Sequence, residues 1–122
     1  GLDIVGWSDV KCIGISVARQ KERGTQVIAE FANMLAEHYN LKERYDDSIL
    51  FNTDYLCGGY EKYTPKMEEF LLEATRKTGM VFDTTYSGKA FYGMMDMIKK
   101  TPEMQNKNIL FWHTGGLMNL MK

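Results

Sequence analysis

Short apolar runs alternate with amphipathic stretches along this chain, and the alternation limits the possible folds more than any other feature. The apolar runs predict strands at residues 10–18, 48–52, 80–82 and 108–112. The stretches between them predict helices at residues 22–39, 65–78 and 88–100. A βαβαβαβ order is typical of α/β proteins, in which parallel strands form the middle of three layers. The sequence therefore predicts a three-layer parallel α/β sheet.

Local signals mark the ends and the buried faces of these elements. The first run is apolar without a period of two, as in a central strand buried on both faces. Thr64 before Pro65 predicts a helix start, and Gly79 predicts the end of that helix. Ser87 is the predicted N-cap of the third helix, which we expect to end at Thr101. The positions expected to face the sheet are Val27, Ile28, Phe31, Met34, Leu35 and His38, then Met67, Phe70, Leu71 and Ala74, then Phe91, Met94, Met95 and Ile98.

Length, charge and cysteine content narrow the class of protein. With 122 residues, 44% of them apolar, the chain is expected to form a single α/β domain across residues 1–122. A net charge of −1 provides no basic surface for nucleic acid or an anionic membrane, and no apolar run is long enough to span a bilayer. Cys12 and Cys57 lack metal-ligand spacing, so we expect reduced thiols in a cytoplasmic protein, with a single disulfide as the alternative.

Three of the predicted strands are followed by glycine-containing turns that carry hydroxyl or phenol groups. These turns are Gly58-Gly59-Tyr60, Tyr86-Ser87-Gly88 and His113-Thr114-Gly115-Gly116. Ligand-binding groups of α/β proteins collect at the carboxyl ends of strands, so the turns predict one shared crevice. The backbone of the last turn is a candidate for holding an anion. The alternative is that all three are only turns and helix caps. His113 has no second ligand at metal spacing, so we do not expect it to bind a metal.

The order and spacing of these motifs resemble a known family. Together with Asp83-Thr84-Thr85 and Leu110-Phe111-Trp112, they resemble the C-terminal part of the D-cysteine desulfhydrase and 1-aminocyclopropane-1-carboxylate deaminase family. The resemblance implies a tryptophan-synthase-β-like (fold type II) enzyme with pyridoxal phosphate as cofactor, a small amino-acid substrate, and a homodimer at full length. It also implies that the lysine bound to the cofactor and the phosphate-binding loop lie upstream, in the rest of the parent enzyme. We therefore expect this fragment to be inactive alone, with no cofactor covalently bound to it.

The resemblance also assigns roles to residues that are present here. It implies that Tyr60 and Tyr86 are catalytic phenols that surround the substrate and assist proton transfer. The deaminases carry Glu after the second tyrosine and Leu after the histidine, whereas this chain has Ser87 and Thr114. A carboxylate facing the pyridine nitrogen of the cofactor keeps that nitrogen protonated, whereas a hydroxyl leaves it neutral. A neutral ring is the weaker electron sink. We expect Thr114 to make that contact, with Ser87 as the second choice and Gly115 also at the cofactor.

A weaker electron sink favours the desulfhydrase side of the family. It suffices for removing an α-proton and expelling a β-thiol, but it is less suited to opening a cyclopropane ring. The implied reaction is β-elimination from D-cysteine or a related amino acid, which gives pyruvate, ammonia and sulfide. The alternatives are a 1-aminocyclopropane-1-carboxylate deaminase, or a noncatalytic α/β domain that binds a small anion or mediates association.

Some residues depart from the family pattern or complicate it. Glu61 stands where the family usually has a glycine, and Leu117-Met118-Asn119 replaces small and proline-containing residues. Lys89 lies beside the second motif, but we expect a structural or electrostatic role because the family's cofactor lysine is far upstream. Sheet edges and the crevice-facing surface are expected to be exposed, which favours self-association.

Overall fold

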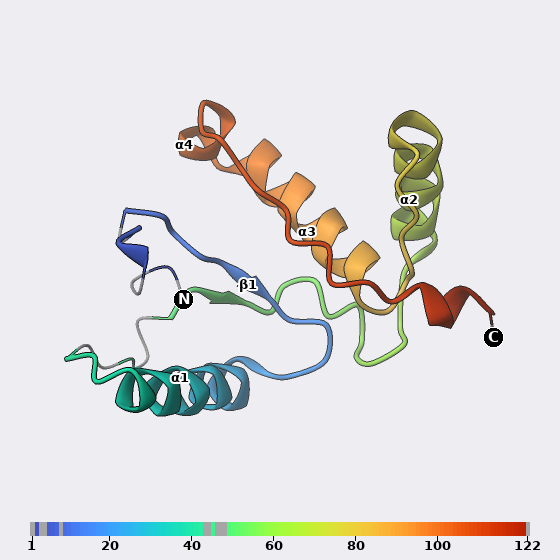
Figure 1. Ribbon diagram of the computed structural model, residues 1–122. Coiled ribbons are helices and arrows are strands. Elements are labelled where there is room, and N and C mark those ends of the chain that lie inside the picture. Colours follow the sequence, from blue (N-terminus) through green and yellow to red (C-terminus); the bar gives the residue numbers. More distant parts are fainter. Residues whose placement is uncertain (1, 3–4, 8, 43–44, 46–48, 122) are drawn as a thin grey trace.

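The computed structural model describes residues 2, 5–7, 9–42, 45 and 49–121. Its elements, in chain order, are β1 (Gly14–Ile15), α1 (Lys21–His38), β2 (Phe51–Asn52), α2 (Pro65–Thr78), α3 (Ser87–Lys100), α4 (Pro102–Gln105) and the 3-10 helix η2 (Leu117–Met121). Figure 1 shows α1 on one side of the strands and α3 on the other, while the segment after α4 runs back along α3. The architecture is α/β, with a small sheet.

The sheet consists of two parallel strands, β1 and β2, which are joined through α1. Gly14 lies opposite Phe51 and Ile15 opposite Asn52. The N–H of Gly14 donates to the carbonyl of Leu50 at 2.8 Å, which extends the pairing beyond the ladder. A parallel pair connected through a helix is the βαβ unit that the sequence predicted. The predicted strand at 10–18 is thus confirmed at its centre and the one at 48–52 at its last two residues, and Ser48 lies outside the described residues.

The predicted strands at 80–82 and 108–112 are wrong: in the structure both stretches are irregular. A strand forms only when its N–H and C=O groups meet a neighbouring ladder, and the described residues provide no such ladder here. The expected burial of the first run is also wrong, since Val10 is 52% exposed and Cys12 is exposed. Among the described residues, one neighbouring strand covers only one edge of that run, so the run is not a central strand.

The helix α1 forms as predicted, but it does not bury the predicted face. Phe31 and Met34 are 66% and 65% exposed, whereas the small residues Gly24, Thr25 and Ala36 are buried. A Cβ added at Gly24 would lie 2.0 Å from the ring of Phe51, so the helix lies very close to β2. Close approach of backbone to sheet selects small residues, and the large apolar residues therefore face outward.

The helices α2 and α3 form the core with the segments that follow them. Met67, Leu71 and Phe82 are buried together, as the predicted stripe of α2 required. The Phe82 ring stacks on Phe91 of α3, with centroids 4.4 Å apart. The predicted caps of α2 are confirmed. The Thr64 side chain accepts from the N–H of Met67 at 3.2 Å, and Gly79 ends the helix at φ 73°.

The cysteines and the helices bear on two of the expectations drawn from the sequence. Both Cys12 and Cys57 are free thiols. Within the described ranges, no helix combines the length and the apolar character that crossing a membrane requires.

Candidate active site

The phenols of Tyr60 and Tyr86 meet, although the two residues lie 26 positions apart in the sequence. Their hydroxyl groups share a hydrogen bond, and their rings pack edge to face with centroids 5.9 Å apart. The hydrogen bond that Tyr60 shares with Tyr86 is the main cause that raises the pKa of Tyr60. Tyr60 is 50% exposed and Tyr86 is 36% exposed. The structure thus joins the first and second glycine-containing motifs through a pair of accessible phenols.

The turn that carries Tyr60 has an unusual backbone. Gly58 and Gly59 have φ values of 92° and 126°, and the non-glycine residues Cys57 and Glu61 also have positive φ, 54° and 56°. A left-handed conformation costs a non-glycine residue about 1–2 kcal/mol. Glu61 therefore occupies a position whose conformation favours glycine, which gives a physical reason for the family's usual residue at this place.

A buried carboxylate, Asp83, organises the turn before α3. Its two oxygens accept hydrogen bonds from the backbone N–H groups of Thr85, Tyr86 and Ser87 at 2.7–2.9 Å. Burial alone raises the pKa of Asp83, but hydrogen bonds from the Ser87 hydroxyl and from these N–H groups outweigh it, and the pKa is lowered. Asp83 is 0% exposed. It therefore fixes the backbone that presents Tyr86.

Asp83, which holds the turn that carries Tyr86, was not predicted from the sequence as a residue of the site. It lies within the family motif, but the sequence predicted Ser87 as the N-cap of α3. In the structure Tyr86 is the N-cap and makes no side-chain cap bond, so Asp83 supplies the acceptors. An Asp shortly before a Ser-Gly helix start was the available signal, because acidic side chains favour helix N-termini.

The third motif lies against the same carboxylate. A Cβ added at Gly116 would be 2.4 Å from Asp83 Oδ1, and the Asn119 amide donates to Asp83 Oδ2 at 3.3 Å. His113 Nε2 donates to the carbonyl of Val81 at 3.1 Å, while His113 Nδ1 accepts from the N–H of Gly115 at 3.1 Å. Hydrogen bonds and close packing thus bring all three motifs together.

The predicted cofactor-contacting residues differ in their surroundings. The Ser87 hydroxyl donates to Asp83 Oδ1 at 2.7 Å, and Ser87 is only 1% exposed. Thr114 is exposed. The N–H of Gly115, which was a candidate for holding an anion, is used by His113. Of the three, Thr114 has the most accessible side chain for a ligand.

A further tyrosine, Tyr55, contacts α3 from the turn after β2. The Tyr55 hydroxyl donates to Asp96 Oδ2 at 2.9 Å, and burial followed by this hydrogen bond raises the pKa of Tyr55 to about 12. The Tyr55 ring also leaves no room for a side chain at Gly93, where an added Cβ would lie 2.8 Å from the ring. This contact packs α3 against the turn after β2.

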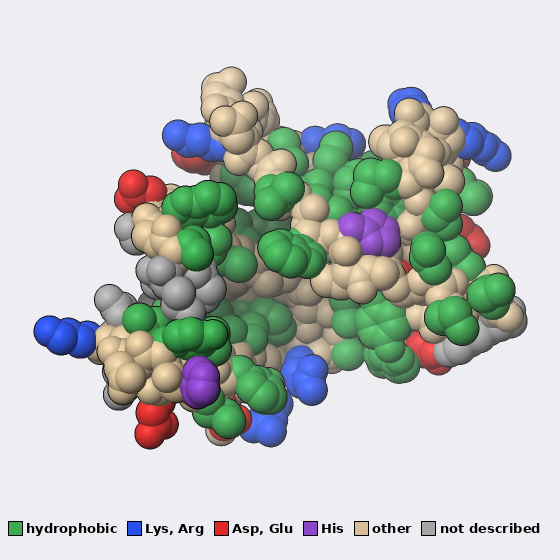
Figure 2. Space-filling model, in the orientation of Figure 1, with side chains coloured by type: hydrophobic (Ala, Val, Ile, Leu, Met, Phe, Trp, Pro, Cys, Tyr) green, Lys and Arg blue, Asp and Glu red, His purple; other side chains and the backbone are tan. Residues whose placement is uncertain are grey.

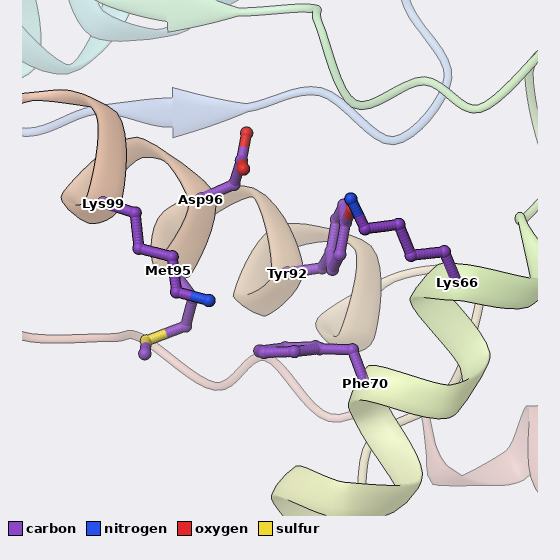
Figure 3. Close-up of a pocket in the computed structure, with 6 residues that line it drawn as sticks. All are labelled: Lys66, Phe70, Tyr92, Met95, Asp96 and Lys99. Atoms are coloured by element: carbon purple, nitrogen blue, oxygen red, sulfur yellow. The ribbon is translucent and has the colours of Figure 1, made fainter.

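A small pocket of about 100 Å³ lies between α2 and α3, away from the predicted site residues. Figure 3 shows the Phe70 ring from α2 lying beside α3, which contributes most of the lining. The lining residues are Lys66, Phe70, Tyr92, Met95, Asp96 and Lys99. No group of three or more potential metal ligands occurs among the residues that the structure describes. The candidate site is therefore the hydrogen-bonded phenols of Tyr60 and Tyr86 and not this pocket.

Comparison with known proteins identifies the relatives of the chain. No family model matches the sequence. A Pyrococcus horikoshii protein named provisionally as a 1-aminocyclopropane-1-carboxylate deaminase is 33% identical over 96% of this chain and 34% of its own length. A Bradyrhizobium 1-aminocyclopropane-1-carboxylate deaminase is 28% identical over 87% of this chain and 32% of its own length.

A plant relative carries both activities in its name. The mitochondrial bifunctional D-cysteine desulfhydrase/1-aminocyclopropane-1-carboxylate deaminase of Arabidopsis thaliana is 43% identical over 51% of this chain and 16% of its own length. The chain spans about a third of the length of the Pyrococcus and Bradyrhizobium relatives. By sequence, the chain belongs to the D-cysteine desulfhydrase and 1-aminocyclopropane-1-carboxylate deaminase family.

Proposed function

We propose that this chain is part of a pyridoxal-phosphate-dependent lyase that acts on D-cysteine or a related β-substituted amino acid. In the proposed reaction, D-cysteine and water give pyruvate, ammonia and hydrogen sulfide. The observation that carries the proposal is the hydrogen-bonded pair of accessible phenols, Tyr60 and Tyr86, in a member of this family. The other alternative, a noncatalytic domain, offers no reason for two half-exposed phenols to share a hydrogen bond.

The hydroxyl of Thr114 suits the pyridine nitrogen of the cofactor better than that of Ser87. Thr114 is exposed, whereas the Ser87 hydroxyl is buried and already donates to Asp83. Pyridoxal phosphate, when bound, supplies the electron sink for breaking bonds at the amino acid's α-carbon. Thr114 would face the ring nitrogen without protonating it, Gly115 would lie beside the ring, and Ser87 is the second choice for the nitrogen contact.

The phenol pair is proposed to move the proton that accompanies the leaving group. The pKa of Tyr60 is raised, chiefly by its hydrogen bond with Tyr86, so its hydroxyl stays protonated at neutral pH. A protonated phenol can act as a general acid toward a sulfur atom that leaves as a thiolate. One phenol would donate to the sulfur while the other stabilises the oxygen that has lost its proton.

A deaminase is the second candidate, because several relatives carry that name. The hydroxyl-bearing Ser87 and Thr114 are what favour the desulfhydrase in our proposal. The family implies a small amino-acid substrate and a homodimer of the complete enzyme. The two free cysteines and the net charge of −1 support the proposal of a cytoplasmic location with no nucleic-acid or membrane partner. The catalytic lysine would come from the rest of the parent enzyme.

The experiment is a substitution at Thr114 in the complete enzyme. Thr114→Glu places a carboxylate at the ring nitrogen, so we expect a changed absorption spectrum of the bound cofactor and slower release of pyruvate from D-cysteine. Thr114→Val keeps the size without the hydroxyl and is the matched control for the charge. An unchanged spectrum in Thr114→Glu, with a changed one in Ser87→Glu, would move the nitrogen contact to Ser87.

The substrate is tested separately with the unmodified enzyme. Release of sulfide with pyruvate from D-cysteine supports the desulfhydrase. Release of ammonia from 1-aminocyclopropane-1-carboxylate, without activity on D-cysteine, would favour the deaminase instead. Borohydride reduction in the presence of pyridoxal phosphate should label no lysine of residues 1–122, and specific labelling of one of them would contradict the proposal.

A further inference from the structure

Lys89 is a fully buried lysine whose ammonium group is enclosed by backbone carbonyls. Lys89 is 0% exposed. Its Nζ donates to the carbonyl oxygens of Val17 at 3.1 Å, Leu56 at 3.0 Å and Gly59 at 2.8 Å. An ammonium group has three donors, so these contacts use all of them. A lysine bound in this way has no free donor to offer a ligand.

The surroundings of Lys89 are unusual for a buried charge. None of the acidic side chains among the described residues forms an ion pair with it. Burial lowers its pKa, while the nearby Cys57 and Asp83 act in the opposite direction. A buried charge is retained at a substantial cost unless its partners are well placed. Here the partners are carbonyl dipoles, which attract a cation wherever several converge.

The three carbonyls come from segments that follow the two strands. Val17 lies just after β1, and Leu56 and Gly59 bracket the left-handed turn after β2. Gly59 directly precedes Tyr60, and its carbonyl also accepts from the N–H of Lys62 at 3.2 Å. Lys89 lies in the first turn of α3, and Tyr86 is the N-cap of that helix. The ammonium therefore holds the left-handed turn after β2 at a fixed place relative to Tyr86.

We infer that Lys89 is a positioning residue whose ammonium, through the carbonyl of Gly59, places the Tyr60 phenol within hydrogen-bonding reach of Tyr86. In this role its ammonium binds backbone carbonyls from the segments after both strands and holds those segments at the start of α3. The catalytic consequence of this placement rests on the proposed function, but the placement itself does not.

The inference predicts a property of the unmodified protein. An ammonium with three carbonyl acceptors and no solvent contact exchanges its protons slowly. In the complete protein, labelled with ¹⁵N at lysine Nζ, one protected ammonium signal should persist near neutral pH and disappear in Lys89→Met. Absence of a protected signal in the unmodified protein would overturn the inference.

Removal and chemical replacement of the ammonium test its effect on Tyr60. Lys89→Ala deletes three carbons and the nitrogen, which is the shape of n-propylammonium. With tyrosine labelled with ¹³C at Cζ, and Tyr60 assigned by Tyr60→Phe, the Tyr60 titration in Lys89→Ala should move toward that of an ordinary tyrosine. Millimolar n-propylammonium should restore the original titration, whereas neutral 1-propanol should not.

The controls separate positioning from general stability. Lys77→Ala removes a lysine whose side chain is 72% exposed and should leave the Tyr60 titration unchanged. Lys89→Met keeps most of the side-chain volume, so it replaces Lys89→Ala if that variant does not fold. A Tyr60 titration unchanged in both variants, or restored equally by 1-propanol, would reject the inference.

These measurements need neither cofactor nor substrate. If the enzyme lacks lyase activity but Tyr60 responds to Lys89 as described, the proposed function fails and the positioning role stands. If the enzyme is active and the Tyr60 titration is unchanged by substitution of Lys89, the positioning role fails and the proposed function stands.

Discussion

At the scale of single residues, Asp83 accepts more hydrogen bonds at the site than any residue that was predicted from the sequence. Three backbone N–H groups and one hydroxyl converge on its carboxylate in a fully buried position. These donors would be left facing one another if the carboxylate were absent. Each hydrogen bond to a charged group contributes about 1.5–3 kcal/mol to the stability of a folded protein. Asp83 is thus the residue whose change should disturb the Tyr86 turn most.

Asp83→Asn is expected to lower the free energy of unfolding by roughly 2 kcal/mol at pH 7, because an NH₂ group would then face N–H donors. The pKa of Asp83 is lowered in the folded protein. Its stabilisation is therefore complete above the unfolded pKa, near 3.9, and is lost as the pH falls through the folded pKa. Urea unfolding at several pH values should show the two proteins converging in acid.

The matched control is Asp54→Asn, the same substitution at an exposed aspartate, which should change stability by less than about 0.5 kcal/mol. A difference between Asp83→Asn and the unmodified protein that stays constant from pH 7 to pH 3 would contradict the assignment of a charged, buried Asp83.

At the scale of elements, the three main helices were predictable, whereas two of the four predicted strands do not form among the described residues. The limits of α2 follow from Thr64, Pro65 and Gly79, because caps and fixed φ angles act within a few residues. A strand depends on a neighbour that can be distant in the chain, so apolar content at 80–82 and 108–112 indicated extended structure without specifying a partner. The buried face of α1 was missed because Gly24 packs against Phe51, a contact that no periodicity reveals.

The site shows the same division. The convergence of the three motifs was predicted from the strand-helix order, although only two of the four predicted strands form within the described residues. The bonds that hold them together involve Asp83 and Lys89, which combine burial with several backbone partners. Such partners depend on turn geometry, so the sequence alone does not reveal them.

Two glycines at opposite ends of helices allow a test at this scale. A Cβ at Gly88, in the first turn of α3, would lie 2.1 Å from the backbone oxygen of Asp83. Gly79, after α2, has open space around it but a φ of 73°. We expect Gly79→Ala to cost about 1 kcal/mol through backbone strain, and Gly88→Ala to cost about 3 kcal/mol because a backbone atom must move.

Chemical unfolding of both variants checks the order of the two effects. Equal losses, or a Gly88→Ala protein as stable as the unmodified one, would mean that the turn at Asp83 can rearrange freely. That result would also weaken the role of Asp83 in presenting Tyr86.

At the scale of the whole molecule, the chain exposes many large apolar side chains. Figure 2 shows hydrophobic side chains gathered on the face along which the segment after α4 runs. The most exposed members near the C-terminal end form what we call the C-terminal apolar surface: Leu110, Trp112, Met118 and Met121, which are 76–86% exposed. Large apolar patches of this kind favour association.

We therefore expect the purified 122-residue chain to self-associate in a concentration-dependent manner. Sedimentation velocity should show a weight-average mass that rises above 14.1 kDa as concentration increases. Leu110→Glu combined with Trp112→Gln introduces a charge and removes the largest ring, so it should shift the equilibrium toward monomer. Leu72→Glu, at a leucine of α2 that is 55% exposed, is the matched control and should leave the mass unchanged. A monomer at high concentration, or an equal effect of Leu72→Glu, would show that the C-terminal apolar surface does not drive association.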